Sequence, residues 1–410
     1  MSAPTLRFKE FESKVEVKKL GNISNIVVGF VGTVSDQYCD PNEGIPFVRT
    51  QNVREGYFSI ENLEYVTKEF HKKNKKSQIF NGDVLIARVG ANMGMVCAVE
   101  NLDTEANCAN VIIIKNNPQL NSQYLSLFLN SENGQKQIHS GGAGGAQAVF
   151  NTTLAKEISF PYFPLQEQTK IASFLSAVDE KINHLTQKHQ LLSQYKQGMM
   201  QKLFSQQIRF KADDGSEFGE WDEYSLDTLL SKIIDNRGKT PVTEANLEIP
   251  LIEVNAIGQR RIKYEKVSKY FSEDTFQNWF RAYLEHQDIL FSTVGNTAIC
   301  SIYTDEIKAG IAQNIVGLRA NTKLIQPTFL YYLLTEISNN QKFKSIEMQA
   351  VQPSIKVSQM IHLTFLTPCL EEQIKIADFL SSIDQKIEVV TQQIEQGKLW
   401  KKGLLQQMFV

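Results

Sequence analysis

Two stretches of this 410-residue chain place hydrophobic residues at the spacing of a coiled-coil helix. Most of the apolar positions follow one another at alternating intervals of four and three residues, so they form one narrow seam along each predicted helix. Such a seam packs against a partner helix. The seam positions are Ile171, Leu175, Val178, Ile182, Leu185 and Leu192 in the first stretch, and Ile376, Leu380, Ile383, Ile387, Val390 and Ile394 in the second.

The two stretches are copies of each other. Ten of the sixteen residues from Gln168 to Asn183 are identical 205 residues later, with no gap. A single seam of this kind is typical of a core helix or a dimer helix. Two matching seams in one chain offer each other a partner, which predicts an intramolecular helix pair. Polar residues on the seam, among them Lys196 and Lys401, are expected to fix its register at some cost in stability.

The residues before each helix alternate between short apolar runs and turn residues. Pro46–Thr50, Asp83–Gly90 and Val111–Ile114 are predicted strands, and 122–138 is a predicted helix with Ser122 near its cap. The pattern recurs 205 residues later, for instance at Asp288–Gly295. A period this long indicates tandem duplication of a whole domain rather than a solenoid. The expected fold class is α/β in the broad sense (α+β), with two globular domains in tandem.

The predicted boundaries follow from this repeat. The first globular domain is expected at residues 1–163 and its helix at 164–205. The second globular domain is expected at 206–367 and its helix at 368–410. The helices are nearly identical, while the domains share a skeleton and differ elsewhere. One shared scaffold is therefore expected to carry two globular domains that recognise different targets.

Composition limits the class of protein. The formal net charge of −2 argues against a broadly cationic surface but allows local basic patches. No apolar run is long enough to span a bilayer, and a signal sequence is not evident. The five cysteines are scattered without a Cys-x-x-Cys pair, so neither a disulfide framework nor a zinc site is expected. These features predict a cytoplasmic protein.

Catalytic motifs are scarce. The glycine turn 90–94 lacks the lysine and hydroxyl residue of a phosphate-binding loop. An Asn-Pro-Pro-Tyr motif for a flipped adenine and a Phe-x-Gly-x-Gly motif for a methyl donor are absent from the sequence. Asp288, Glu306 and Lys308 imitate the spacing of a metal-dependent nuclease. Asp83 matches Asp288 at a turn before a strand, which indicates a structural role. The chain is predicted to have no catalysis of its own and no metal site.

Polar and basic segments remain as candidates for nucleic-acid contact. Lysines clustered over a few residues suit phosphate groups, whereas arginine, glutamine and asparagine can hydrogen-bond base edges. The candidates are Arg49, Gln51, Asn52, Lys72, Lys73, Lys75, Lys76, Arg88 and Asn92 in the first domain, and Arg237, Lys239, Asn255, Arg260, Arg261, Lys263 and Asn296 in the second. A solvated surface loop would have the same appearance, as would ordinary drift of surface residues.

A signature at the start of each helix resembles a known family. The pattern Phe-Pro-x-x-Pro-Leu-Gln-Glu-Gln-x-Lys-Ile-Ala-x-Phe-Leu-Ser-x-x-Asp-x-Lys-Ile spans 160–182, and a close variant spans 365–387. Together with the strands at 83–90 and 288–295, it resembles the specificity subunit of type I restriction-modification enzymes over essentially the whole chain.

The resemblance implies a function. In that family two target recognition domains each read one half of a bipartite, asymmetric DNA site. The two helices pair as an antiparallel coiled coil that sets the gap between the half-sites. The expected partners are double-stranded DNA, two methyltransferase subunits and two translocase-nuclease subunits, with no membrane. No cofactor is expected on this chain, because S-adenosylmethionine, ATP and Mg²⁺ belong to the partner subunits.

Two rival functions and one local ambiguity remain open. The chain would otherwise be a coiled-coil scaffold that joins proteins without touching DNA, or a nuclease that uses Asp288, Glu306 and Lys308. Apolar residues at the ends of both helices fit either a partner surface or a cap against the globular domains. These residues are Met199, Met200, Leu203, Phe204, Leu404, Leu405, Met408 and Phe409.

Overall fold

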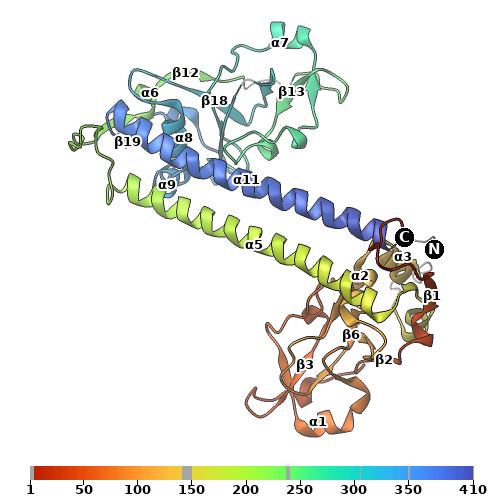
Figure 1. Cartoon of the computed structure of the whole chain (residues 1–410). Helices are drawn as coiled ribbons and strands as arrows, with labels where there is room; N and C mark the ends of the chain where they lie inside the picture. Colours follow the sequence, from red (N-terminus) through yellow and green to blue (C-terminus); the bar gives the residue numbers. More distant parts are fainter. Residues whose placement is uncertain (1–3, 141–149, 237–240, 305, 350, 410) are drawn as a thin grey trace. The chain divides into compact units, whose positions relative to one another are not determined.

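The chain divides into two compact units by its internal contacts. The computed structural model describes residues 4–140, 150–236, 241–304, 306–349 and 351–409. Unit 1 comprises Met1–Gln187 together with Gln392–Val410, and unit 2 comprises Lys188–Thr391. Each unit holds one globular domain, the start of the long helix that follows it, and the end of the other long helix (Figure 1). Because this division cuts both long helices, the boundaries expected from sequence stay a prediction.

Unit 1 is built from three sheets and a group of helices. Its strands are β1 (Glu16–Lys19), β2 (Ile26–Val28), β3 (Ile45–Val48), β4 (Glu64–Val66), β5 (Gln78–Ile79), β6 (Val84–Ala87), β7 (Val96–Ala98), β8 (Ala106–Cys108), β9 (Val111–Ile114) and β10 (Ser159–Tyr162). Its helices are α1 (Lys68–Lys73), α2 (Ser122–Asn130), α3 (Glu132–Ser140), α4 (Thr152–Glu157) and the first part of α5 (Leu165–Phe204).

The central sheet of unit 1 is buried on both faces. Its strand order is β2-β9-β6-β7, all antiparallel. Alternate residues of β6 point into two different cores: Val84 and Ile86 pack with the helices, whereas Leu85 and Ala87 pack with the second sheet. That second sheet has the order β4-β3-β8-β5, in which β3 and β8 run parallel. Period-two side-chain alternation explains why β6 is apolar at every position.

Unit 2 repeats this plan. Its strands are β11 (Asp222–Ser225), β12 (Leu230–Ile234), β13 (Ile249–Ile252), β14 (Tyr270–Phe271), β15 (Ile289–Ser292), β16 (Cys300–Ile302), β17 (Gly310–Ile311), β18 (Ile315–Ala320) and β19 (Thr364–Thr367). Its helices are α6 (Leu226–Leu229), α7 (Glu273–Trp279), α8 (Pro327–Thr335), α9 (Ile337–Ser345), α10 (Val357–Met360) and α11 (Leu370–Met408), together with the end of α5. The central sheet has the order β12-β18-β15-β16 and the second sheet the order β14-β13-β17.

The single helix predicted at 122–138 is two helices. Asn121, not Ser122, caps α2, because its side chain accepts a hydrogen bond from the backbone N–H of Tyr124. The break falls at Ser131, whose extended backbone separates α2 from α3. A side-chain carbon at Gly134 would lie 2.3 Å from the carbonyl oxygen of Phe128, so only glycine allows α3 to fold back this closely.

A buried ion pair holds the start of each long helix. In unit 1 the carboxylate of Glu167 is fully buried and accepts hydrogen bonds of 2.6 and 2.7 Å from Arg7. In unit 2 Glu372 accepts bonds of 3.1 and 2.7 Å from Arg209. Both glutamates belong to the repeated signature. Their burial explains why the signature carries a charged residue at the beginning of an otherwise amphipathic helix.

The next residue of the signature ties each long helix to a shorter one. Gln168 accepts a hydrogen bond from the backbone N–H of Asn121, the cap residue of α2, at 2.9 Å. Gln373 accepts the equivalent bond from Gln326, the cap residue of α8, at 2.8 Å. The amide nitrogen of each glutamine donates to two backbone carbonyls. The signature therefore encodes the attachment of the helix to its domain.

The long helices run antiparallel within unit 1. Phe174 of α5 contacts Trp400 of α11, and Ile182 of α5 packs against Gly397 of α11. A later residue of α5 thus meets an earlier residue of α11, as in an antiparallel pair. The carboxylate of Asp179 lies 2.7 Å from the ammonium of Lys401. The predicted polar residue on the seam is thus matched by an acid on the opposite helix.

Unit 2 contains the equivalent polar pair. The Asp384 carboxylate lies 2.6 Å from the Lys196 ammonium and accepts a 2.6 Å hydrogen bond from the hydroxyl of Tyr332. Burial and the neighbouring Asp384 charge raise the pKa of Tyr332, so its hydroxyl remains a donor. In the described part of unit 2, this contact joins α5, α8 and α11.

The seam residues serve the domain cores as well as the helix pair. Ile171, Leu175, Val178 and Ile182 are buried in the same core as α2, and Ile376, Leu380 and Ile383 in the same core as α8. Val390 is buried too. Leu185, Leu192, Ile387 and Ile394 are half-buried. The first turns of each seam therefore also pack on the domain that precedes the helix.

The last residues of both long helices pack against the globular domains. In unit 1, Phe409 is 1% exposed and contacts Tyr124 and Phe128. In unit 2, Phe204 contacts Phe329, and Leu203 is buried in the same core. Packing against a globular domain is therefore observed for Leu203, Phe204 and Phe409, one of the two meanings left open for this set.

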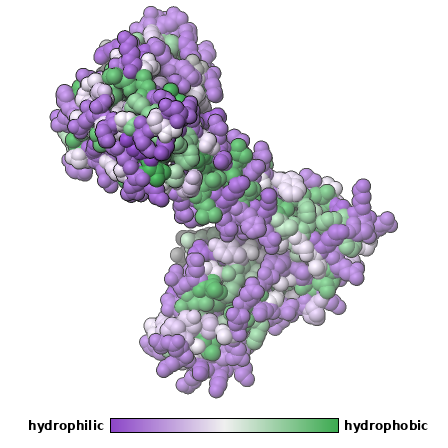
Figure 2. All heavy atoms as spheres, turned by 60° about the vertical axis from the view of Figure 1, so that its left-hand side comes forward, coloured by the Kyte–Doolittle hydropathy of each residue, from purple (hydrophilic) through white to green (hydrophobic). Residues whose placement is uncertain are grey.

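The visible surface is mostly hydrophilic. Figure 2 shows hydrophobic residues only in patches between hydrophilic ones on the face that it presents. Among the described residues, no helix combines the length and the apolar character needed to cross a membrane.

Candidate nucleic-acid interface

In unit 1 a short loop follows the end of β3. Arg49 has an extended backbone and precedes the 3₁₀ helix Thr50–Asn52. The backbone N–H of Arg49 donates to the side chain of Asn52 at 3.0 Å. The Arg49 guanidinium is half-exposed, and its nearest approach to the carboxylate of Glu64 on β4 is 4.0 Å. The loop therefore presents a charged side chain on a fixed backbone.

Two of the predicted contact residues hold this loop in place instead of pointing outward. Asn52 is 1% exposed, and its amide nitrogen donates to the carbonyls of Ser59 and Glu61. Because its polar atoms serve the loop, Asn52 is withdrawn as a candidate for base contact. Asn92 donates to the carbonyls of Thr50 and Val53 at 3.0 and 3.3 Å, so it braces the same loop from the β6–β7 turn.

Gln51 and Arg88 complete the candidates in this region. Gln51 is exposed at the tip of the 3₁₀ helix. Arg88 follows β6, and its Nε atom is buried without a hydrogen-bond partner in the described part of the chain. The structure thus brings Arg49, Gln51 and Asn92 to one loop, with Arg88 at the end of the neighbouring strand.

The lysine cluster lies on helices rather than in the loop that the sequence suggested. Lys72 and Lys73 end α1, whose first turn is capped by Thr67. Lys75 and Lys76 begin the 3₁₀ helix Lys75–Ser77. All four are exposed, and none forms an ion pair with another described residue. In Figure 1, α1 lies at the end of unit 1 remote from α5.

A buried histidine explains why the lysine cluster is ordered. His71 is 6% exposed and contacts Asn107 on β8 through Nδ1. Its Nε2 atom lies 3.0 Å from the Glu105 carboxylate. The helix is thereby fixed to the second sheet, while the four lysines that follow His71 are exposed. Lysines in the last turn of a helix also interact favourably with its dipole.

In unit 2 the corresponding loop follows β13. Glu253 has an extended backbone and precedes the 3₁₀ helix Val254–Ala256. Its carboxylate accepts a hydrogen bond of 2.7 Å from Lys269. Asn255 is exposed, and its amide donates to the carbonyl of Lys266 at 3.2 Å.

A recess of about 570 Å³ opens beside this loop. Glu253 and Lys269 line it, together with Asn296 from the turn after β15. Trp279 supplies an apolar wall, and Asn314 also lines the recess, with a buried side-chain amide oxygen that has no partner among the described residues. A concave site with an aromatic wall and several amide groups suits the polar edge of a flat molecule.

The second basic segment of unit 2 does not assemble into one site. Arg261 forms an ion pair of 3.0 Å with Glu388 of α11, so it faces the long helix. Arg260 and Lys263 are half-buried, and their backbones bond to Ile302 and Ala256. Arg261 is therefore a weaker candidate than its sequence context suggested. Arg237 and Lys239 lie outside the described residues.

Sequence reasoning missed several residues at these sites. Glu64 on β4 and Lys269 directly before β14 lie beside Arg49 and Glu253, and Trp279 and Asn314 line the recess. The internal repeat could have pointed to Glu64 and Lys269, because these two residues lie 205 positions apart, which is the offset of the repeat. Trp279 and Asn314 gave no comparable signal.

The residues of the nuclease hypothesis have structural partners. Asp288 accepts bonds of 3.0 and 2.9 Å from Arg319 on β18, and Asp83 accepts one of 2.7 Å from Lys115, which directly follows β9. Lys308 bonds to Glu273. Within the described ranges no three His, Cys, Asp or Glu side chains are grouped to hold a metal ion. The geometry gives a metal-dependent nuclease no support.

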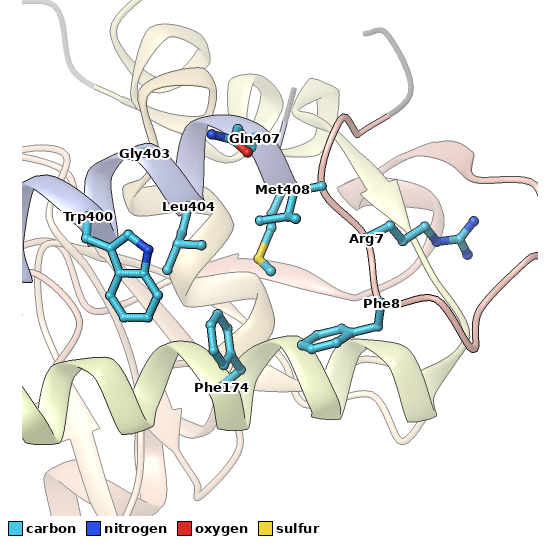
Figure 3. Close-up of a pocket in the computed structure, with 9 residues that line it drawn as sticks. Arg7, Phe8, Phe174, Trp400, Gly403, Leu404, Gln407 and Met408 are labelled. Carbon is cyan, nitrogen blue, oxygen red and sulfur yellow. The ribbon is translucent and has the colours of Figure 1, made fainter.

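A second kind of surface lies on the long helices of unit 1. A groove of about 450 Å³ is bordered by α5, α11 and the N-terminal segment. Figure 3 shows Trp400, Leu404 and Met408 pointing from α11 into this groove. Phe174 of α5 and Phe8 border it from the opposite side, whereas Arg7 points away. Its apolar lining suits a protein side chain.

Comparison with known proteins agrees with this architecture. The MjaVIII specificity subunit of a type I restriction enzyme from Methanocaldococcus jannaschii is 26% identical over 374 residues, which cover 88% of this chain and 87% of that protein. The crystal structure of a type I restriction-modification S subunit from M. genitalium covers 100% of this chain and 99% of its own, with a TM-score of 0.60 and 15% identity. A chain from a structure concerned with complex assembly and conformational transition of the type I system covers 96% and 97%, with a TM-score of 0.53 and 14% identity.

The family model agrees with the internal repeat. The model of the type I restriction modification DNA specificity domain matches residues 12–194 and again residues 219–397. Each match contains one globular domain and most of the helix that follows it. The chain therefore belongs to the family of type I restriction-modification specificity subunits and carries two DNA specificity domains in tandem.

Proposed function

We propose that this chain selects the DNA sequence on which a type I restriction-modification complex acts, and that each globular domain reads one half of a bipartite, asymmetric site. One observation carries the proposal. The buried framework is the same in both units, as the Glu167–Arg7 and Glu372–Arg209 pairs illustrate, whereas the residue after β3 or β13 differs, Arg49 in one unit and the partly buried Glu253 in the other. A repeated framework with a divergent residue at this position is what two readers of different sequences require.

The paired helices are proposed to set the gap between the two half-sites. A 40-residue helix such as α5 is about 60 Å long at roughly 1.5 Å per residue. One turn of DNA is about 34 to 36 Å. Helices of this length can separate two reading sites by about a turn of the duplex.

The apolar groove on the helices is proposed to receive a methyltransferase subunit. Phe174, Trp400 and Leu404 give it an apolar lining, and Trp400 is about half-exposed. Large aromatic side chains in such positions are typical anchors of protein interfaces. Two methyltransferase subunits and two translocase-nuclease subunits would complete the complex in the cytoplasm. Catalysis, S-adenosylmethionine, ATP and Mg²⁺ are assigned to these partners.

Genome-wide mapping of N6-methyladenine tests the proposal. A host without other adenine methylation would carry the partner methyltransferase, with or without this chain. A split motif that occurs only when the chain is present is the expected result. Replacing residues 206–365 by those of another specificity subunit should then change one half-site and leave the other unchanged.

Two results would contradict the proposal. Absence of methylation in both cultures, with the methyltransferase expressed and bound to this chain, would favour a protein scaffold. A domain replacement that altered both half-sites would show that the domains do not read independently. Duplex binding by the purified complex, measured with the mapped motif and with a scrambled one, separates a scaffold from a DNA reader.

A further inference from the structure

The two units carry the same surface ion pair with its charges exchanged. In unit 1 the cation Arg49 follows β3 and the anion Glu64 stands on β4. In unit 2 the anion Glu253 follows β13, and the cation Lys269 directly precedes β14. β3 pairs antiparallel with β4, and β13 with β14, so the two pairs bridge equivalent strands.

The backbone at the first position is nearly identical in the two units. Arg49 has φ −117° and ψ 171°, and Glu253 has φ −107° and ψ 168°. Each residue separates the end of a strand from a three-residue 3₁₀ helix. Both strands also pair in parallel with the strand on their other side, β8 or β17. The fold therefore presents opposite charges from the same place.

We propose that this position determines specificity in both domains, with Arg49 reading a guanine in one half-site and Glu253 reading a cytosine in the other. The inference rests on the proposed function. In the major groove guanine offers two acceptors, N7 and O6, which match the donor fork of arginine. Cytosine offers the N4 amino donor, which matches a carboxylate.

The partner of each reading residue explains why the position tolerates either charge. A lone carboxylate that faces DNA is repelled by the phosphates, but Lys269 at 2.7 Å offsets the charge of Glu253. Arg49 needs less support, and its approach to Glu64 of 4.0 Å is too long for a hydrogen bond, so its donors stay available for a base. Glu64 and Lys269 are positioning residues in this scheme.

The surroundings of Glu253 fit a base edge. Glu253 and Lys269 line the 570 Å³ recess, where the side chains of Asn296, Gln313 and Asn314 provide further polar groups. The side chains of Arg49, Glu64 and Lys269 are each about half-exposed, so a duplex can reach them without unfolding the loop.

Exchange of the charges tests the proposal. The full chain would be produced with its methyltransferase in a host without other adenine methylation, and N6-methyladenine would be mapped for the wild type and for E253K/K269E. The variant keeps an ion pair but presents a cation. We expect one position of one half-site to change from cytosine to guanine, with a shift in preference of about 5- to 150-fold. The other half-site and the gap should stay unchanged.

A matched control exchanges another exposed ion pair of unit 2. Lys211 and Glu217 lie 2.7 Å apart, and both side chains are well exposed. K211E/E217K should leave the whole motif unchanged. An unchanged motif in E253K/K269E, or a change in both half-sites, would overturn the proposal. Failure of the wild type to produce a split motif would instead count against the proposed function itself.

Two single substitutions settle the case in which the exchanged variant methylates nothing. E253Q keeps the size of the side chain and removes its charge, whereas R49Q removes the charge and shortens the side chain. Each should make one position of one half-site degenerate, R49Q at a guanine and E253Q at a cytosine, and the two changes should fall in different half-sites. Motifs identical to that of the wild type in both variants would refute the assignment.

Discussion

The carboxylate of Glu372 shows how a single buried charge holds a long helix to its domain. It accepts hydrogen bonds from Nε and Nη2 of Arg209 and from the indole N–H of Trp221 at 3.2 Å. The hydrogen bond to Glu372 raises the pKa of Arg209, so the guanidinium keeps its charge throughout the alkaline range. Removing such a partner leaves a buried charge without compensation, which is costly.

We expect Arg209→Met to destabilise the protein by about 3 kcal/mol, because Glu372 stays fully buried after its main partner is lost. Lys211→Met, two residues away, removes a pair in which both side chains are well exposed and should cost less than about 1 kcal/mol. Urea unfolding of the two variants measures the difference. Equal losses would show that the buried ion pair does not anchor α11.

The four exposed lysines at the end of α1 should act on the phosphate backbone rather than on bases. Each phosphate contact contributes about −0.9 to the slope of log affinity against log salt. Replacement of Lys72, Lys73, Lys75 and Lys76 by glutamine should weaken binding to all duplexes about equally and reduce the slope by as much as about 3.6. Equilibrium binding at several salt concentrations gives the slope. Replacement of the exposed Lys9 and Lys14 by glutamine is the control. If both variants gave the same slope of log affinity against log salt, the four lysines would be ordinary solvated surface residues without phosphate contacts.

At the scale of elements, the sequence predicted the regular parts better than the loops. The strands around Val84 and Val111 and both long helices follow from apolar spacing, which depends on burial alone. The break at Ser131 depends on the close approach of Gly134 to α2, a tertiary contact that no local pattern contains. Gln51 and Asn52 are adjacent and chemically similar, yet the 3₁₀ helix exposes one and buries the other. Their different roles could not be predicted from residue type.

The glycines of α11 provide a test of the helix packing. An added side-chain carbon at Gly403 would meet no described atom within 4 Å, whereas at Gly397 it would lie 3.1 Å from Cγ1 of Ile182. Gly403→Ala should therefore stabilise the protein by about 0.5 to 1 kcal/mol through helix propensity. At Gly397 the same gain is opposed by contact with Ile182, so Gly397→Ala should stabilise less or destabilise. Thermal unfolding of both variants measures the effects, and a larger gain at Gly397 would contradict the observed packing.

At the scale of the whole molecule, the duplication was readable because ten identities at one offset leave little room for coincidence. The residues of the proposed base-reading site could be predicted from the sequence only in part. Arg49 was visible as a polar candidate, but the exchange of charge with Glu253 becomes meaningful only with Glu64 and Lys269 beside these two residues. These partners come from a neighbouring strand, so their proximity depends on sheet register rather than on local sequence.

The proposed role of the long helices as a ruler leads to the last prediction. Insertion of one heptad after Thr186 in α5 and one after Thr391 in α11 preserves the apolar seam of both helices, because seven residues are two turns of a coiled coil. The insertions fall next to the divisions between the two compact units, so each globular domain keeps its own core. Seven residues add about 10 Å of helix, which equals about three base pairs at 3.4 Å each.

We expect the methylated motif of this variant to keep both half-sites and to lengthen its gap by about three base pairs. Insertion of a heptad in α5 alone is the control, because it shifts the Lys196–Asp384 pair out of register and should reduce methylation without defining a new gap. Genome-wide mapping of N6-methyladenine reads half-sites and gap in one experiment. An unchanged gap in the double insertion, or altered half-site letters, would mean that something other than the helix pair measures the distance between the two reading domains.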